Sequence, residues 1–191
     1  MTNGAAQRPE VGVATLIIKS DQEDGVTKLL LGKRLGKHAH GTWGLPGGKL
    51  EFGEGLTDGA IREICEEIGD DMEFTVPRYW TIANTFYPDE PRHFLVVFMI
   101  AFWESGEPCA AEPDKCAEWQ WFDWHDLPEP LMQGIERLLT ATVPTDDTDA
   151  ICRPQWNMFQ QRVLGDSCWP PRAAARDFVY NWEPNEEEEA E

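Results

Sequence analysis

The chain has 191 residues, of which 41 % are hydrophobic and 11 % aromatic, and its formal net charge is −19. This length predicts one domain with an extension, or at most two small domains, and the apolar content excludes a globally disordered chain. The negative balance disfavours binding of nucleic-acid polymers, because that binding relies on lysine and arginine releasing counterions from phosphates.

The sequence also indicates a compartment. The first thirty residues hold no charged start followed by an apolar run, and no run reaches the roughly 20 residues of a membrane span. The odd number of cysteines, without paired metal-ligand spacing, favours free thiols in a reducing environment. These are Cys65, Cys109, Cys116, Cys152 and Cys168. We therefore expect a cytoplasmic protein without membrane contact.

The first part of the chain predicts a pair of strands. Residues 1–9 are polar and are expected to be flexible. The apolar runs 11–19 and 27–34 follow, with turn residues at 22–25 between them, which is typical of paired strands.

Four cationic or titratable side chains lie at the end of this pair or just after it. Lys33 and Arg34 end the second run beside a glycine-rich segment, so they are the best candidate phosphate ligands, although strand ends are often simply solvated. His38 and His40 have no acid or cysteine at ligand spacing, and we interpret them as plain loop residues.

The stretch 47–69 combines turn glycines with one helical pattern. Thr57 is the expected helix N-cap and Gly69 the expected end of the helix. A helix turns about 100° per residue, so an apolar stripe and an acidic face fall on nearly opposite sides. The stripe is Ile61, Ile64, Cys65 and Ile68, and the acidic face is Glu63, Glu66 and Glu67.

The clustered acids allow two interpretations. Glutamate-rich helical faces are commonly just solvated surface. Like charges at this spacing repel, however, and a hard divalent cation such as Mg²⁺ prefers carboxylate oxygens and would remove that repulsion. The acid face is therefore a candidate metal site.

After this helix the sequence alternates strand and helix patterns. Strands are expected at 74–86, 93–103 and 118–124, and a short amphipathic helix at 131–139. The run 93–103 is apolar on both faces, as expected of a central strand covered on each side. The fold class is therefore α/β or α+β. Trp119, Trp121 and Trp124 are interpreted as core and rim packing.

The stretch 47–69 resembles the Nudix hydrolase box. The matching positions are Gly48, Glu54, Arg62, Glu63, Ile64, Glu66, Glu67 and Gly69, and only Asp70 departs, where the box has an aliphatic residue. Further segments, among them LLGKR, LPGG and EPDKC, are similar to plant and animal MutT-like Nudix enzymes over about residues 10–142. The resemblance implies the Nudix fold, a mixed β-sheet sandwiched between α-helices.

The resemblance also implies a divalent-metal site. Glu63 and Glu67 match the principal metal ligands, Glu66 a further ligand or base, and the Gly47 carbonyl a backbone ligand. Arg62 would orient these acids. Glu112 is a candidate fourth carboxylate, with a plain surface acid as the alternative. The expected cofactor is Mg²⁺, with Mn²⁺ as a substitute, because cleaving a diphosphate requires charge neutralisation and a deprotonated water.

A base pocket is implied in the same way. The corresponding positions are Leu45, Asn84, Phe86, Met132 and Ile135, for which core packing is the alternative. The implied reaction converts a nucleoside triphosphate, of the modified or non-standard purine deoxynucleotide class, to the monophosphate and diphosphate. The alternatives are hydrolysis of another nucleoside-diphosphate-linked or isoprenyl diphosphate substrate, and a non-catalytic nucleotide-binding module. The expected partner is a small nucleotide, and a homodimer is left open.

Beyond residue 142 the resemblance ends. Residues 143–182 are expected to form an extension that packs on the domain or binds a partner, since Trp156 and Phe159 give it an apolar pattern. Residues 183–191 are expected to be an acidic disordered tail.

Overall fold

The computed structural model describes residues 8–20, 26–87 and 92–140. The chain divides into two units, Met1–Trp156 and Asn157–Glu191, and all described residues belong to the first. The predicted extension, the acidic tail, Cys152 and Cys168 lie outside the described residues.

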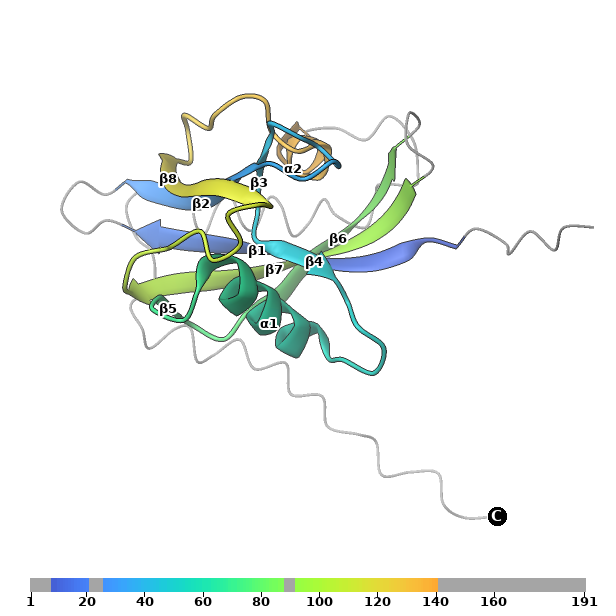
Figure 1. The fold of residues 1–191 in the computed structure, drawn as a ribbon, viewed down its shortest axis with the longest axis horizontal. Coiled ribbons are helices and arrows are strands. Elements are labelled where there is room, and N and C mark those ends of the chain that lie inside the picture. The colour runs from blue at the N-terminus through green and yellow to red at the C-terminus, as the bar shows by residue number, and fades with distance from the viewer. Residues whose placement is uncertain (1–7, 21–25, 88–91, 141–191) are drawn as a thin grey trace, which may run out of the picture. The chain divides into compact units, whose positions relative to one another are not determined.

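Eight strands and two helices make up the described part (Figure 1). In chain order they are β1 (Glu10–Ser20), β2 (Thr27–Arg34), β3 (Trp43–Gly44), β4 (Gly47–Lys49), α1 (Leu56–Ile68), β5 (Glu73–Phe74), β6 (Arg78–Tyr87), β7 (Arg92–Ser105), β8 (Cys116–Asp123) and α2 (Gln133–Thr140). Within these ranges no helix is long and apolar enough to cross a membrane.

The sheet is mixed. β1 runs parallel to β7, with Glu10 opposite Phe94 and Ile18 opposite Phe102, and the other strand pairs described are antiparallel. β1 and β2 pair as predicted. β7 also pairs with β5 and β6, and three successive residues of it, Val97, Phe98 and Met99, are buried. The prediction of a central strand covered on both faces is therefore confirmed.

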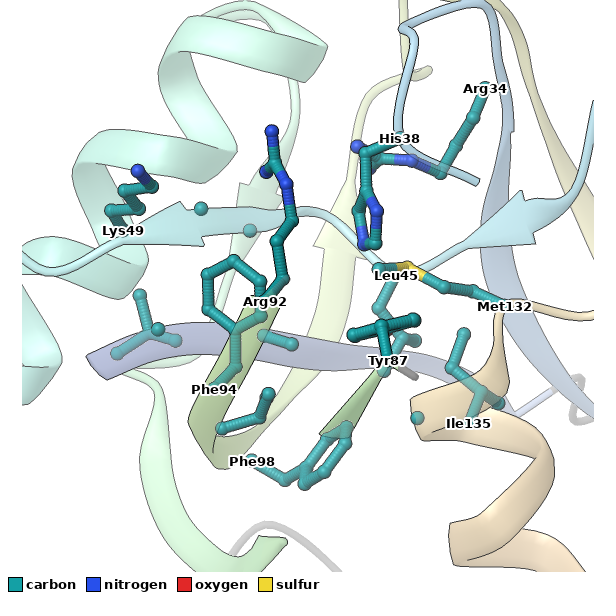
Figure 2. A pocket seen from close by; sticks show the side chains of 17 residues that line it. Arg34, His38, Leu45, Lys49, Tyr87, Arg92, Phe94, Phe98, Met132 and Ile135 are labelled. Carbon is teal, nitrogen blue, oxygen red and sulfur yellow. The ribbon is translucent and has the colours of Figure 1, made fainter. Parts of the chain in front are cut away.

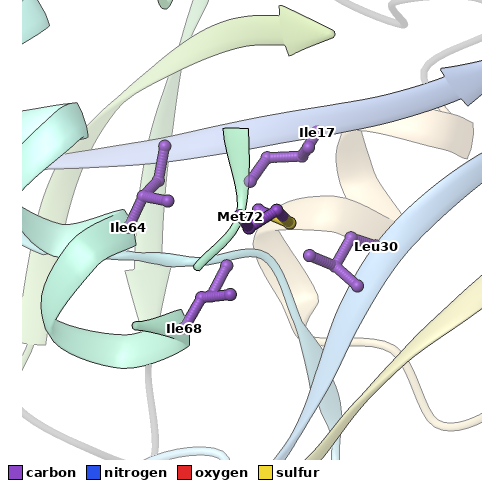
Figure 3. Packing of buried hydrophobic residues seen from close by; sticks show 5 residues of the cluster. All are labelled: Ile17, Leu30, Ile64, Ile68 and Met72. Carbon is purple, nitrogen blue, oxygen red and sulfur yellow. The ribbon is translucent and has the colours of Figure 1, made fainter. Parts of the chain in front are cut away.

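One face of the sheet is covered by α1. Ile64 and Ile68 of the predicted stripe are fully buried and pack with Ile17, Leu30 and Met72 (Figure 3). Burial of an isoleucine side chain contributes about 1.5–3 kcal/mol, so these two residues fix the helix on the sheet. The acids of α1 therefore face away from this cluster.

The helix ends were predicted with mixed success. Gly69 ends α1, with its N–H donating to the Cys65 carbonyl at 3.0 Å and a φ of 90°, which favours glycine. The prediction for Thr57 is wrong, because the N-cap is Gly55 and has no side-chain capping bond. The Thr57 hydroxyl instead donates to the Pro77 carbonyl at 3.4 Å, which ties α1 to the segment before β6.

Two other boundaries differ from the prediction. The single strand expected over 74–86 is divided into β5 and β6, and Pro77, which has no N–H for a strand ladder, lies between them. The second helix starts at Gln133 rather than residue 131, because Leu131 forms a bridge with Trp43 and the Met132 N–H donates to the Trp43 carbonyl at 2.8 Å.

The opposite face of the sheet carries α2. Successive residues of a strand face opposite sides, so Val97 and Met99 pack on Ala60 of α1, while Phe98 lies near Gly134 of α2. Figure 1 shows the two helices on opposite sides of β1 and β7. This arrangement confirms the predicted α+β class, a mixed sheet between helices.

The tryptophans and cysteines also match their predictions where they are described. Trp124 is buried, and Trp119 and Trp121 pack, partly buried, against the cluster around Ile17. Cys65, Cys109 and Cys116 are free thiols.

Candidate active site

Arg62 is the hub of the acid face. Its guanidinium donates to both carboxylate oxygens of Glu54, at 2.7 and 3.0 Å, and to Glu63 at 2.8 Å. A weaker pair at 3.3 Å joins Glu66, and the Lys49 carbonyl accepts a bond at 3.2 Å. The bond from Arg62 lowers the pKa of Glu54 to about 2, and the carboxylates raise the pKa of Arg62. Arg62 therefore orients several acids at once.

Glu67 lies in a different environment. Its carboxylate accepts a hydrogen bond from the Gly47 N–H at 3.0 Å. Burial raises its pKa to about 7, against the effect of that bond and of Arg34, and the negative charges of Glu63 and Glu112 act in the same direction as burial. The charged form of Glu67 is thus disfavoured, mainly by its burial.

Two glycines bring the backbone against these acids. A Cβ on Gly48 would lie 2.5 Å from both carboxylate oxygens of Glu63. Gly47 has a φ of 152°, and a Cβ there would overlap the Val13 carbonyl of the neighbouring strand. Only glycine at both positions lets β4 lie between β1 and the acid face.

The oxygen-rich acid face fits a divalent cation chemically. Among the described residues no three His, Cys, Asp or Glu side chains already converge on a metal position, because Arg62 engages Glu63, the Gly47 N–H engages Glu67, and Lys115 engages Glu112 at 2.6 Å. A cation would nevertheless stabilise the charged form of Glu67, which burial disfavours and next to which Glu63 and Glu112 add negative charge. The Glu66 side chain is 53 % exposed, so a hydrated cation in the solvent can reach its carboxylate.

A cavity of about 210 Å³ adjoins β4 (Figure 2). Gly47, Gly48 and Lys49 line it, so β4 contacts the acids and also borders the cavity. The remaining wall is mostly apolar. Its larger side chains are His38, Leu45, Tyr87, Phe94, Val96, Phe98, Met132 and Ile135, and its further cations are Arg34 and Arg92.

The structure separates the five predicted base-pocket residues. Leu45, Met132 and Ile135 line the cavity, whereas Asn84 and Phe86 do not. The reason is the alternation of β6, since Tyr87 faces the cavity and its neighbour therefore faces the other side. Asn84 is hydrogen-bonded to His93, and Phe86 is 53 % exposed. Both lie away from the cavity.

Lys33 and Arg34 are separated in the same way. Arg34 lines the cavity, and its Nε is buried without a hydrogen-bond partner in the described part of the chain. The Lys33 ammonium instead lies 5.0 Å from the centre of the Trp43 ring. Of the two, Arg34 is therefore the one placed to meet a ligand beside β4.

Sequence reasoning missed most of the cavity residues, and four of them carry large polar or aromatic side chains at its edge. His38 occupies a loop as expected but also lines the cavity, together with Tyr87, Arg92 and Phe94. The alternation of β6 and β7 could have indicated Tyr87 and Phe94, but nothing in the sequence indicated His38, which reaches the cavity only through the fold. His40 remains a loop residue, with its Nδ1 2.9 Å from the Leu35 carbonyl.

Comparison with known proteins identifies the family. The NUDIX domain model matches residues 8–142. The chain belongs to the Nudix family. A solved structure similar to this Nudix chain is that of a MutT NUDIX hydrolase from Burkholderia pseudomallei, with 32 % identity, a TM-score of 0.60, and coverage of 68 % of this chain and 95 % of that one.

Two curated relatives carry more specific names. A Mycobacterium tuberculosis protein provisionally named 8-oxo-dGTP diphosphatase 3 is 31 % identical over 151 residues, covering 74 % of this chain and 69 % of its own. An ADP-ribose pyrophosphatase of Methanocaldococcus jannaschii is 33 % identical over 124 residues, covering 63 % of this chain and 66 % of its own. This Nudix chain is thus a hydrolase of nucleotide diphosphate linkages, in a family that generally depends on a divalent metal.

Proposed function

We propose that this Nudix hydrolase converts a nucleoside triphosphate to the monophosphate and diphosphate, with Mg²⁺ as cofactor and Mn²⁺ as a substitute. One observation carries the proposal: Gly47 and Gly48 border the apolar cavity and also contact Glu67 and Glu63. A base held in the cavity would therefore place its phosphates beside the acid face.

The chain's own residues have distinct roles in this reaction. Glu63, Glu66, Glu67, Glu112 and the Gly47 carbonyl would hold the divalent ion. When bound, the metal supplies charge neutralisation on the phosphates and an activated water. Arg62 keeps Glu63 and Glu54 oriented through its 2.8 and 2.7 Å bonds.

Cations on the cavity side offset the acidity of the chain. With a net charge of −19, the protein repels a polyphosphate at long range, so attraction has to be local. Arg34, Lys49 and Arg92 line the cavity, and the buried Nε of Arg34 can donate to a phosphate oxygen. The same net charge supports a small nucleotide rather than a nucleic-acid polymer as the substrate.

The size of the cavity favours a single base. Its volume of about 210 Å³ is below the roughly 300–1,000 Å³ of pockets that bury drug-sized ligands. It can receive one ring system, while the ribose and phosphates extend toward β4. We assign the base to the modified or non-standard purine class, which the name of the mycobacterial relative supports.

The alternative substrate is ADP-ribose or another nucleoside-diphosphate-linked compound. The name of the Methanocaldococcus jannaschii relative, which is 33 % identical, favours it. Such a substrate also offers one base to the cavity, but it adds a second sugar that has to lie beyond the phosphates. The two candidates therefore differ in what is attached to the second phosphorus.

A substrate panel separates them. Diphosphate and phosphate release should be measured with Mg²⁺ for dGTP, 8-oxo-dGTP, dATP, ADP-ribose, a dinucleotide and isopentenyl diphosphate. We expect the highest kcat/KM for a triphosphate, with diphosphate as the product and activity lost in excess chelator. A higher kcat/KM for ADP-ribose would overturn the proposal and establish the alternative.

A further inference from the structure

Three rings from separate parts of the chain meet at the cavity. His38 comes from the loop between β2 and β3, Tyr87 ends β6, and Phe94 lies near the start of β7. The ring centres are 4.5 Å apart for His38 and Tyr87, 6.1 Å for His38 and Phe94, and 6.3 Å for Tyr87 and Phe94. Figure 2 shows all three side chains around the cavity.

These rings are not core residues. All three are half-buried, whereas Phe98, which lines the same cavity, is 1 % exposed. Their contacts with one another leave apolar surface directed to the cavity. Apolar surface in a concave site is covered by a ligand with apolar faces, and aromatic side chains stack on the faces of nucleobases.

We propose that His38, Tyr87 and Phe94 form an aromatic wall that binds the planar base of the substrate. This aromatic wall rests on the proposed function and adds to it the side chains that select a ring-bearing substrate. It takes the role that the family resemblance had given to Phe86 and Asn84, which face away from the cavity.

The cations around the cavity indicate how the base and the phosphates of the ligand are oriented. Arg92 is the cross-strand neighbour of Tyr87, and Lys49 follows Gly48 on β4, so two cations border the cavity that the wall lines. Gly47 lines the same cavity and donates its N–H to Glu67 at 3.0 Å, so the side of the cavity formed by β4 is the one that adjoins the acid face. The base therefore lies against the aromatic wall, and the phosphates extend along β4 toward Glu67.

The test compares His38→Ala and Tyr87→Ala with controls from the same elements. His40→Ala removes a second histidine from the same loop, and Tyr79→Ala removes an exposed tyrosine from β6. Steady-state kinetics should be measured with the best triphosphate of the panel.

Since stacking of one base contributes about 1–3 kcal/mol, we expect each wall variant to raise KM roughly tenfold to a hundredfold with a smaller change in kcat. Tyr87→Phe should restore KM, because it keeps the ring.

A second measurement separates ring binding from turnover. Calorimetric titration with a nucleoside monophosphate and with inorganic diphosphate, both with Mg²⁺, should show that the wall variants lose affinity for the monophosphate only. A wild-type protein that hydrolyses no triphosphate would refute the proposed function, while this titration would still test the aromatic wall. Equal monophosphate affinity of wild type and His38→Ala would refute the proposal that the aromatic wall binds the base. The absence of monophosphate binding by the wild type would refute it as well. Thermal melting of each variant identifies any loss of folding, and the loop variant His38→Ala suffices if Tyr87→Ala unfolds.

Discussion

The acid face of α1 and the cavity beside β4 are built in opposite ways. The acid face comes from one stretch of sequence and is held by charged hydrogen bonds, with Arg62 joined to Glu54, Glu63 and Glu66. The cavity is assembled from elements far apart in the chain and is held by apolar packing around a few cations. In the proposed function, the residues of the chemistry are therefore encoded locally, while the recognition of the substrate depends on the fold.

The largest effect is expected at the acid face. Glu67→Gln keeps the size of the side chain and removes the charge, so kcat should fall by several orders of magnitude with little loss of folding stability. The exposed Glu51→Gln is the matched control and should leave kcat unchanged. Retention of a tenth of the wild-type rate by Glu67→Gln would show that the acid face is not the reaction centre.

The next effect concerns the hub of that face. Arg62→Ala leaves the carboxylates of Glu54 and Glu63, which are 14 % and 12 % exposed, without their common partner. We expect a lower melting temperature together with a fall in kcat. Arg62→Lys should rescue little, because an ammonium cannot donate to both oxygens of Glu54 while also reaching Glu63. Full rescue by lysine, in melting and kinetics, would show that only charge matters here.

A third effect tests whether phosphate binding depends on the position of each cation in the cavity. Arg34→Ala should weaken binding of a non-hydrolysable triphosphate by about tenfold or more, since hydrogen bonds to charged groups contribute about 1.5–3 kcal/mol. Lys33→Ala is its neighbour control, and its effect should be smaller because the Lys33 ammonium lies over Trp43 rather than in the cavity. Equal losses in calorimetric titration would indicate that long-range charge, and not position, attracts the phosphates.

A fourth effect is a pH dependence of stability without divalent ions. The pKa of Glu67 is raised from 4.5 to about 7, so the folded state keeps a proton that the unfolded state has released. The free energy of unfolding should therefore fall as pH rises from 4.5 through 7, by up to about 3 kcal/mol from this group. The difference in melting temperature between Glu67→Gln and wild type should be small at pH 4.5 and should grow, in favour of the variant, up to pH 8. A difference that stays constant would contradict the raised pKa.

Glu54 contributes with the opposite sign. Its pKa is lowered to about 2 by Arg62, so its stabilising contribution is present above pH 4.5 and is lost as pH falls through 2. The two carboxyls thus act in separate pH windows. Melting curves at low pH report the Arg62 hub, and those near neutrality report Glu67.

The contrast between the two regions also explains what the sequence could predict. The spacing of glycines, isoleucines and glutamates in 47–69 is enough to predict α1, the buried positions Ile64 and Ile68, and the acid face. Thr57 was assigned wrongly because the segment before β6 competes for its hydroxyl. The loop between β2 and β3 has no periodic pattern, so only the packing of His38 on Tyr87 and Phe94 could reveal its place at the cavity.

The smallest effect is expected where family resemblance and geometry disagree. Leu45 lines the cavity, whereas Phe86 lies on the other side of β6 with its ring edge against His93. Leu45→Ala should therefore raise KM for the nucleotide several-fold, and Phe86→Ala should change it by less than about threefold, because surface substitutions away from a site are usually within about 0.5 kcal/mol. Melting temperatures separate binding from packing, since Leu45 is 5 % exposed and its truncation also costs stability. A larger KM effect for Phe86→Ala would mean that the base lies against the outer face of β6, and that the family alignment describes recognition better than the cavity does.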